Sequence, residues 1–179
     1  MSRITTALDE ACVPYMLAGS FASSLHGAPR ATQDIDVVID PSFESLDRLL
    51  ASLAGDDLYL NADGAREDFK RRGQFNVIDG RSGWKADFIF RKARPFSRSE
   101  LDRRRATTIL GVRIFVASAE DTILAKLEWA KLAQSERQLS DVRGIIGVKS
   151  NALDLEYIER WLDELGVRDL WDRVRRDVE

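Results

Sequence analysis

Two aspartates separated by one residue are the part of this sequence best suited to chemistry. Asp34 and Asp36 open an apolar segment, 34–39, that predicts a strand. Side chains alternate between the two faces of a strand, so both carboxylates would share one face while the apolar residues enter a core. Adjacent carboxylates repel each other unless a cation lies between them, and such oxygen ligands suit Mg²⁺. An isolated Asp-x-Asp is more often only the solvent face of an edge strand, so the motif needs support elsewhere.

That support begins upstream, where the apolar run 15–18 ends at Gly19-Ser20. The pattern predicts a buried strand that turns sharply into a helix. Gly19 would let a ligand approach the backbone closely. The Ser20 hydroxyl and the free N–H groups of the first helical turn would form a seat for phosphate. At the end of this helix lies His26, the only histidine, for which we expect a structural contact and not a role as general base.

A third carboxylate lies in the segment 84–90, the second of two predicted strands. Turn-forming residues at 79–83 separate the two strands and predict an antiparallel hairpin. The apolar side chains of the second strand share one face, which leaves Asp87 on the other. Asp87 would pair with Lys85 or Arg91 if this strand lay at an exposed edge.

A Gly-Ser turn, a helix and then Asp-x-Asp on the next strand together resemble the signature of the nucleotidyltransferase superfamily related to DNA polymerase β. The intervening residues 30–33, Arg-Ala-Thr-Gln, are similar to the Arg-x-Thr-x-Asp-x-Asp form of its minimal and toxin-like branches. In that superfamily a third carboxylate lies beside the first two on a later strand. Asp87 matches it in type and order.

The resemblance implies phosphoryl transfer, in which positioning and charge neutralisation matter most. Asp34 and Asp36 would hold a Mg²⁺ ion that bears the triphosphate. Asp87 would share a second Mg²⁺ that activates the acceptor hydroxyl, with the two ions about 3.5–4 Å apart. Mn²⁺ is the alternative metal. The residues expected to bind the NTP are Gly19, Ser20, Arg30 and Lys126.

From Ser118 onward the sequence predicts only helices, the first at about 119–133. Lys126 lies on an apolar arc of this helix, so its ammonium group either extends to solvent or meets an anion. This region is similar to the C-terminal helical module of nucleotidyltransferase toxins from abortive-infection systems. The similarity implies that Lys126 and Asp141 complete the active site, although Gln138 stands where those toxins often carry an acid. We expect Lys126 to pair with Asp141 or with a core acid, and Lys126→Ala to keep the fold but lose transfer.

Composition restricts the remaining choices. A chain of 179 residues that is 44% hydrophobic can build one domain with a real core, alone or with a small appendage. A net charge of −3 gives no general attraction to nucleic acid, and one cysteine excludes an internal disulfide. The basic run 91–105 is either a solvated helix face or a seat for an anionic acceptor such as an RNA end. The sequence predicts no signal peptide and no membrane span, so we expect a cytoplasmic protein.

The predicted fold is therefore α/β (α+β), with a nucleotidyltransferase-like mixed sheet flanked by helices at 1–117 and a C-terminal helical bundle at 118–179. The predicted function is metal-dependent transfer of a nucleoside monophosphate from an NTP to an acceptor hydroxyl. A toxin-like enzyme would act on RNA or protein beside an antitoxin partner. The alternatives are a small-molecule (antibiotic) nucleotidyltransferase with an acidic acceptor pocket, and a non-catalytic nucleotide-binding module. The presence of all three core carboxylates argues against the non-catalytic module.

Overall fold

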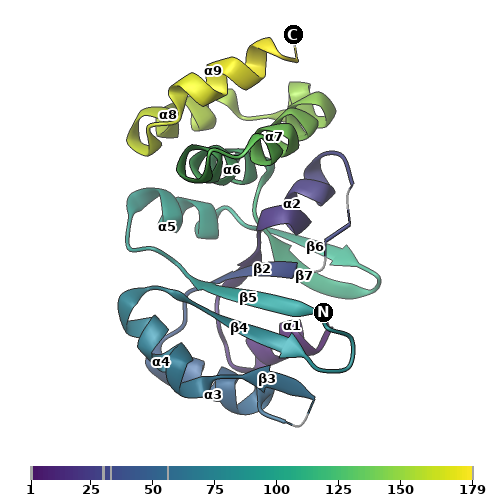
Figure 1. Ribbon diagram of the computed structural model, residues 1–179, viewed down its shortest axis with the longest axis vertical. Helices are drawn as coiled ribbons and strands as arrows, with labels where there is room; N and C mark the ends of the chain where they lie inside the picture. The colour runs from purple at the N-terminus through teal and green to yellow at the C-terminus, as the bar shows by residue number, and fades with distance from the viewer. Residues whose placement is uncertain (1, 30, 33, 56, 179) are drawn as a thin grey trace. The chain divides into compact units, whose positions relative to one another are not determined.

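The computed structural model describes residues 2–29, 31–32, 34–55 and 57–178, and Figure 1 traces the course of the chain. The chain divides into two compact units. The first comprises Met1–Leu17 and Thr32–Val116, and the second comprises Ala18–Ala31 and Ala117–Glu179. The chain passes into the second unit for the last time at residue 117, beside the predicted boundary, but residues 18–31 belong to the second unit as well.

The first unit contains a seven-stranded mixed sheet in the described part of the chain. The order is β3-β4-β5-β2-β1-β7-β6. The strands are β1 (Tyr15–Leu17), β2 (Asp34–Ile39), β3 (Leu58–Leu60), β4 (Gln74–Asp79), β5 (Lys85–Phe90), β6 (Arg105–Ile109) and β7 (Val112–Val116). β2 pairs with β5 and β1 with β7 in parallel, whereas the other neighbours are antiparallel. The predicted mixed sheet and the predicted β4–β5 hairpin are confirmed.

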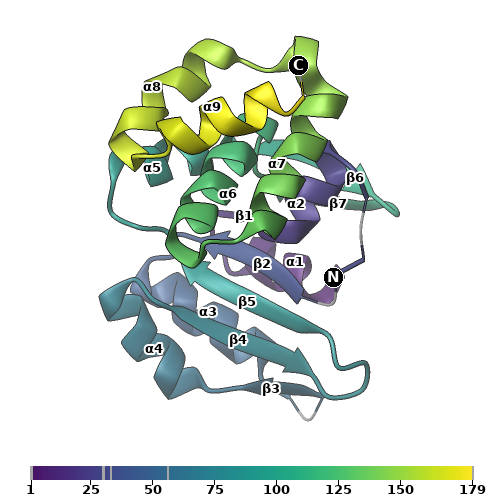
Figure 2. The ribbon, with the colours of Figure 1, turned by 45° about the horizontal axis from the view of Figure 1, so that its top comes forward.

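Helices cover the apolar face of this sheet. They are α1 (Ser2–Glu10), α3 (Phe43–Leu53) and α4 (Ala62–Arg71), and Figure 2 shows them against one face. Ser42 is the N-cap of α3, and its side chain accepts a hydrogen bond from the Ser45 amide. The leucines of α3 at positions 46, 49, 50 and 53 are buried, and each contributes about 1.5–3 kcal/mol to folding. The fourth helix of this unit is α5 (Pro95–Asp102).

Two elements between residues 55 and 74 differ from the sequence prediction. The sequence pattern of this polar segment predicts a short helix from Arg66 to Arg72, but α4 begins earlier, at Ala62, after an N-cap at Asn61. β3 was not predicted at all. It has three residues, of which Tyr59 is exposed, so its pattern is too short to show a period of two. β3 exists because its backbone pairs with β4, which is a tertiary contact.

The second unit is helical. Its helices are α2 (Gly19–His26), α6 (Ala119–Ala133), α7 (Glu136–Lys149), a 3₁₀ turn (Ser150–Ala152), α8 (Leu155–Leu165) and α9 (Arg168–Arg176). α6 has the predicted bounds, and Ser118 caps it by accepting a hydrogen bond from the Asp121 amide. The Asp121 carboxylate is fully buried, where it accepts hydrogen bonds from the hydroxyls of Ser118 and Tyr157. No helix among the described residues is long and apolar enough to cross a membrane.

Candidate active site

The first unit brings the three predicted carboxylates onto one face of the sheet. In the parallel pairing of β2 with β5, Asp36 lies opposite Asp87 and Asp34 lies opposite Lys85. Directly paired residues point to the same face, and residues two apart on one strand do so as well. Asp34, Asp36, Asp87 and Lys85 are therefore neighbours on the face opposite the apolar one, and we call these four residues the carboxylate row.

Asn76 extends this polar row onto a third strand. It lies opposite Asp87 in the antiparallel pairing of β4 with β5, and its side chain is exposed. Asp36, Asp87 and Asn76 thus occupy equivalent positions on three adjacent strands. The sequence gives no reason to select Asn76, because its place depends on the register of the hairpin.

The Lys85 ammonium group lies between two of the carboxylates. Its Nζ is 3.0 Å from Oδ2 of Asp87 and 3.8 Å from Oδ1 of Asp34. The hydrogen bond to Asp87 is the main cause that raises the pKa of Lys85, and the charges of Asp87, Asp34 and Asp36 add to it. From the sequence, we expect Asp87 to pair with Lys85 or Arg91 if β5 is an exposed edge strand, and the pair with Lys85 is present. It lies inside the sheet, however, because β5 has β4 and β2 as neighbours.

The carboxylates offer a suitable donor set for a hard divalent cation. Oδ1 of Asp87 is buried and has no hydrogen-bond partner among the described residues, which is costly for a carboxylate oxygen unless a cation binds it. In the part of the chain that the structure describes, no three His, Cys, Asp or Glu side chains are placed to hold a metal ion together. The donors fit Mg²⁺ in type.

The residues predicted to bind phosphate, Gly19 and Ser20, lie in the second unit at the start of α2. Gly19 is the first residue of α2 and has φ +55°, a left-handed conformation that favours glycine. Ser20 is the second residue of this helix. Ala18 precedes the helix without a side-chain cap, and the N–H groups of a first helical turn have no partner within their own helix. Arg30, the other predicted nucleotide ligand upstream of the strand, lies outside the described residues.

Lys126 and Asp141 form a buried ion pair in the second unit. Lys126 Nζ lies 2.7 Å from Oδ2 of Asp141, and the two side chains are 5% and 11% exposed. The predicted pairing of Lys126 with a carboxylate is confirmed, and an ammonium group extended to solvent is excluded. Lys126 also donates to Oε1 of Gln138 at 2.8 Å. Gln138 therefore supplies an oxygen acceptor at the position where the resembling toxins often carry an acid.

Ser23 connects this ion pair to the start of α2. Its hydroxyl lies 3.1 Å from the carbonyl oxygen of Ser20 and 3.5 Å from Oδ2 of Asp141. Ser23 is buried. Its contacts place Asp141 beside the first turn of α2, so the lysine pair and the Gly-Ser turn belong to one packed region. Sequence reasoning missed Ser23, and a small polar residue on the inner side of a short helix was the only signal.

His26 makes the structural contact expected of it. Its Nε2 lies 2.7 Å from the carbonyl oxygen of Ala117, to which the neutral ring donates a hydrogen bond. Burial is the main cause that lowers the pKa of His26, which favours the neutral ring. His26 thus ties the end of α2 to the residue that precedes the Ser118 cap.

The basic run 91–105 is less available than its composition suggests. Arg91 donates to Asp40 at 2.8 Å, and Arg104 donates to the carbonyl oxygen of Leu101 at 2.7 Å. The basic side chains of the run that are exposed are Lys92, Arg98 and Arg105. The predicted anionic-acceptor surface is therefore reduced to these three.

No protein-family model matches the sequence, and no curated protein matches it significantly. The structure is similar to ANT(2″)-Ia in complex with adenylyl-2″-tobramycin, with a TM-score of 0.57 and 16% identity over 93% of this chain and 94% of that chain. It is also similar to an antigenic nucleotidyltransferase-like protein from Paracoccidioides brasiliensis, with a TM-score of 0.55 and 18% identity over 97% of this chain and 92% of that chain. The fold is that of nucleotidyltransferases. The fold implied by the sequence resemblance is therefore confirmed.

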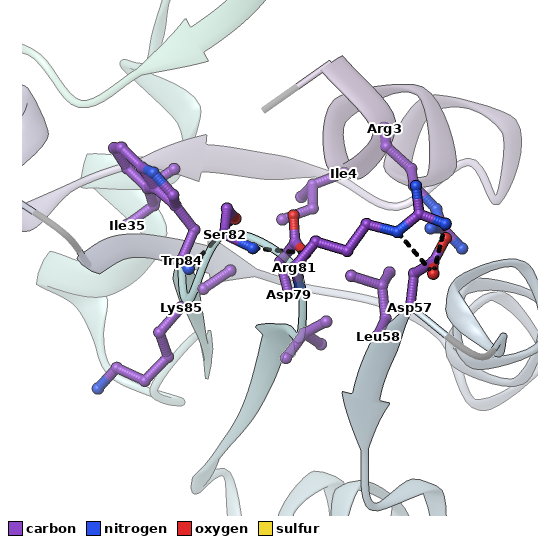
Figure 3. A pocket seen from close by; sticks show the side chains of 12 residues that line it. Arg3, Ile4, Ile35, Asp57, Leu58, Asp79, Arg81, Ser82, Trp84 and Lys85 are labelled. Carbon is purple, nitrogen blue, oxygen red and sulfur yellow. Dashed lines mark hydrogen bonds and ion pairs between the residues drawn. The ribbon is translucent and has the colours of Figure 1, made fainter.

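A pocket of about 420 Å³ in the first unit lies on the other face of this nucleotidyltransferase sheet (Figure 3). Ile35, Ala86 and Val77 line this pocket and are paired neighbours on β2, β5 and β4. Their side chains point to the face opposite the one that carries the three carboxylates. Arg81 crosses the pocket to form an ion pair with Asp57, as Figure 3 shows. The pocket is lined by none of the three core carboxylates, although Lys85 is one of its lining residues.

Proposed function

We propose that this protein is a metal-dependent nucleotidyltransferase that moves a nucleoside monophosphate from an NTP to an acceptor hydroxyl. The register of β2 and β5 is the observation that carries the proposal. It sets Asp36 opposite Asp87, with Asp34 on the same face and a buried Asp87 oxygen without a hydrogen-bond partner among the described residues. Three carboxylates on one face repel each other, and a divalent cation would offset this repulsion more fully than the single ammonium group of Lys85 does.

In this proposal Asp34, Asp36 and Asp87 hold Mg²⁺ or Mn²⁺. The bound metal supplies charge neutralisation at the phosphoryl oxygens and lowers the pKa of a bound hydroxyl. The first turn of α2, with Gly19 and Ser20, receives the terminal phosphates, since helix N-termini favour anions.

Lys126 offsets the negative charge that develops on pyrophosphate as it leaves. A preorganised cation is effective here because it requires no reorganisation during the reaction. Asp141 is the positioning residue that holds the Lys126 ammonium group in place before the NTP binds. Ser23 and Gln138 support the same arrangement through their contacts with Asp141 and Lys126.

Two classes of acceptor are proposed for the hydroxyl. A toxin-like enzyme acting on RNA or protein, with an antitoxin partner, follows from the sequence resemblance, and the exposed Lys92, Arg98 and Arg105 would suit RNA. A small-molecule acceptor is favoured by the similarity to ANT(2″)-Ia, which extends over 94% of that chain and so leaves little of it unmatched. A non-catalytic nucleotide-binding module is the third reading, in which nucleotide binds without turnover.

Calorimetric titration of each Mg-NTP into the wild type and Asp36→Ala tests the metal site. We expect the variant to bind its NTP at least about tenfold more weakly, since even indirect supports of metal ligands are worth about 10–100-fold. Asp102→Ala is the matched control, because it removes the same charge from an exposed position at the end of α5. Equal affinity in the wild type and Asp36→Ala would remove the metal-site proposal.

Incubation with labelled NTPs then distinguishes the acceptors. Each NTP is supplied with Mg²⁺ and RNA, protein, an aminoglycoside or a total cell extract, and both pyrophosphate release and labelled products are measured. Label in RNA or protein supports the toxin-like reading, and label in the aminoglycoside supports the small-molecule reading. Binding of NTP without pyrophosphate release in any mixture indicates the non-catalytic module.

A further inference from the structure

Lys85 is the one side chain of the carboxylate row that bears a positive charge. Lys85 and Asp87 are two residues apart on β5, and Asp34 is directly opposite Lys85 on β2. The strand register therefore places one ammonium group within reach of a carboxylate on its own strand and of another on the neighbouring strand. The observed distances are 3.0 Å to Asp87 and 3.8 Å to Asp34.

We propose that Lys85 is an internal, displaceable counter-ion that occupies the cation position of the carboxylate row until a divalent metal replaces it. This inference rests on the proposed metal site and assigns a residue to its regulation. Lys85 holds the acids together in the free protein, and it lowers their affinity for metal because the ion must first displace it.

The exposure of the three side chains supports displacement. Asp87 is 15% exposed, Lys85 33% and Asp34 56%, so Lys85 and Asp34 are both partly open to solvent. Oδ1 of Asp87 is buried, so the partly exposed Lys85 pair is more accessible to a cation than this oxygen is. Partly exposed ion pairs are weak, and a lysine has a flexible stem of four carbons, so its release is easily achieved.

Lys85 also neutralises Asp87 only in part. It contacts Oδ2, while Oδ1 of the same carboxylate has no hydrogen-bond partner among the described residues. An ammonium group is a compact charge that donates separate hydrogen bonds to individual oxygens. A divalent ion can bind both oxygens of one carboxylate and oxygens of adjacent carboxylates at once. The exchange therefore satisfies an oxygen that Lys85 leaves unsatisfied, which gives the metal its advantage.

Binding of Mn²⁺ alone, followed by the electron paramagnetic resonance signal of the free ion, tests this role without any dependence on turnover. Lys85→Met should bind Mn²⁺ on the order of tenfold more tightly than the wild type, because a like charge a few ångströms from the ion is removed. Lys85→Arg keeps the charge and should bind no more tightly than the wild type. Lys70→Met is the matched control, because this exposed lysine on α4 contacts Glu67 and should leave the affinity unchanged.

The outcomes separate this inference from the proposed function. If the wild type and Lys85→Met bind Mn²⁺ with the same affinity, Lys85 is not a competing counter-ion, although the metal site stands. If neither the wild type nor Lys85→Met binds Mn²⁺, both the metal site and the counter-ion role are overturned.

Thermal unfolding of Lys85→Gln, a smaller change, provides a second readout if Lys85→Met does not fold. Mn²⁺ should raise its Tm by more than it raises that of the wild type, since binding to the folded state stabilises it in proportion to occupancy. An equal rise in Tm for both proteins overturns the inference.

Discussion

Replacing Lys126 with methionine tests the second unit most directly. Met is close to Lys in length and favours helices, so α6 itself should tolerate the change. What the substitution removes is the ammonium group 2.7 Å from Asp141, in a pair whose side chains are only 5% and 11% exposed. The carboxylate of Asp141 stays behind in a buried position.

The cost follows from that burial. At 2.7 Å and an effective dielectric constant of about 20, the attraction between the two charges is about 6 kcal/mol before the cost of desolvation is counted. Removing one partner of a buried pair costs about 3–5 kcal/mol, because the other charge is left uncompensated. This cost is a large part of the free energy of unfolding of a typical domain, which is roughly 5–15 kcal/mol. Helix propensity alone predicted that Lys126→Ala keeps the fold, and the buried pair changes that expectation to marked destabilisation.

A double variant separates stability from chemistry. Lys126→Met with Asp141→Leu removes both charges, and such replacements are often neutral or stabilising. Urea unfolding followed by circular dichroism should show a loss of about 3–5 kcal/mol for Lys126→Met and near-recovery for the double variant. Neither protein should transfer nucleotide, because both lack the Lys126 charge. The wild type and Asp141→Leu complete the cycle.

Two results would refute this reasoning. A cost below about 1 kcal/mol for Lys126→Met would mean that the pair behaves as a surface salt bridge, contrary to its burial. Nucleotide transfer by the folded double variant at the wild-type rate would remove Lys126 from the active site. The helical unit would then have a structural role only.

The sequence predicted what local patterns determine. Alternation placed Asp34 and Asp36 on one face of β2, and the apolar residues of β5 placed Asp87 on its polar face. The cap at Ser118 and the bounds of α6 also follow from neighbouring residues. The pairing of Lys126 with a carboxylate was predictable because an ammonium group on an apolar arc that does not extend to solvent needs an anion.

The features that sequence reasoning missed depend on contacts between distant segments. The residue pattern shows the hairpin that joins β4 to β5, and the family resemblance implied that Asp87 lies beside Asp34 and Asp36. The pattern itself does not set β5 parallel to β2 with Asp36 opposite Asp87. Since a shift of one residue moves every side chain to the other face, the places of Lys85 and Asn76 follow only from that register. The grouping of residues 18–31 with the C-terminal helices is likewise a tertiary property.

Two further predictions concern α2 and its surroundings. A Cβ on Gly27 would lie 2.8 Å from the backbone nitrogen of Ile145, so Gly27→Ala should cost about 1–3 kcal/mol in urea unfolding. Gly147→Ala, which meets nothing within 4 Å, should be neutral or stabilising, and equal effects would contradict the close approach of α2 to α7. His26 predicts a pH dependence, because burial lowers its pKa in the folded protein below the ordinary 6.5. Below about pH 6.5 the unfolded chain then binds the proton more readily, so the free energy of unfolding falls as the pH falls towards the folded pKa, by at most about 1.4 kcal/mol per pH unit. His26→Gln keeps a donor for the Ala117 carbonyl but does not titrate, so its unfolding free energy should lose this part of the slope between pH 7.5 and 5. Identical slopes in the wild type and His26→Gln would show that the imidazole is not held neutral by burial.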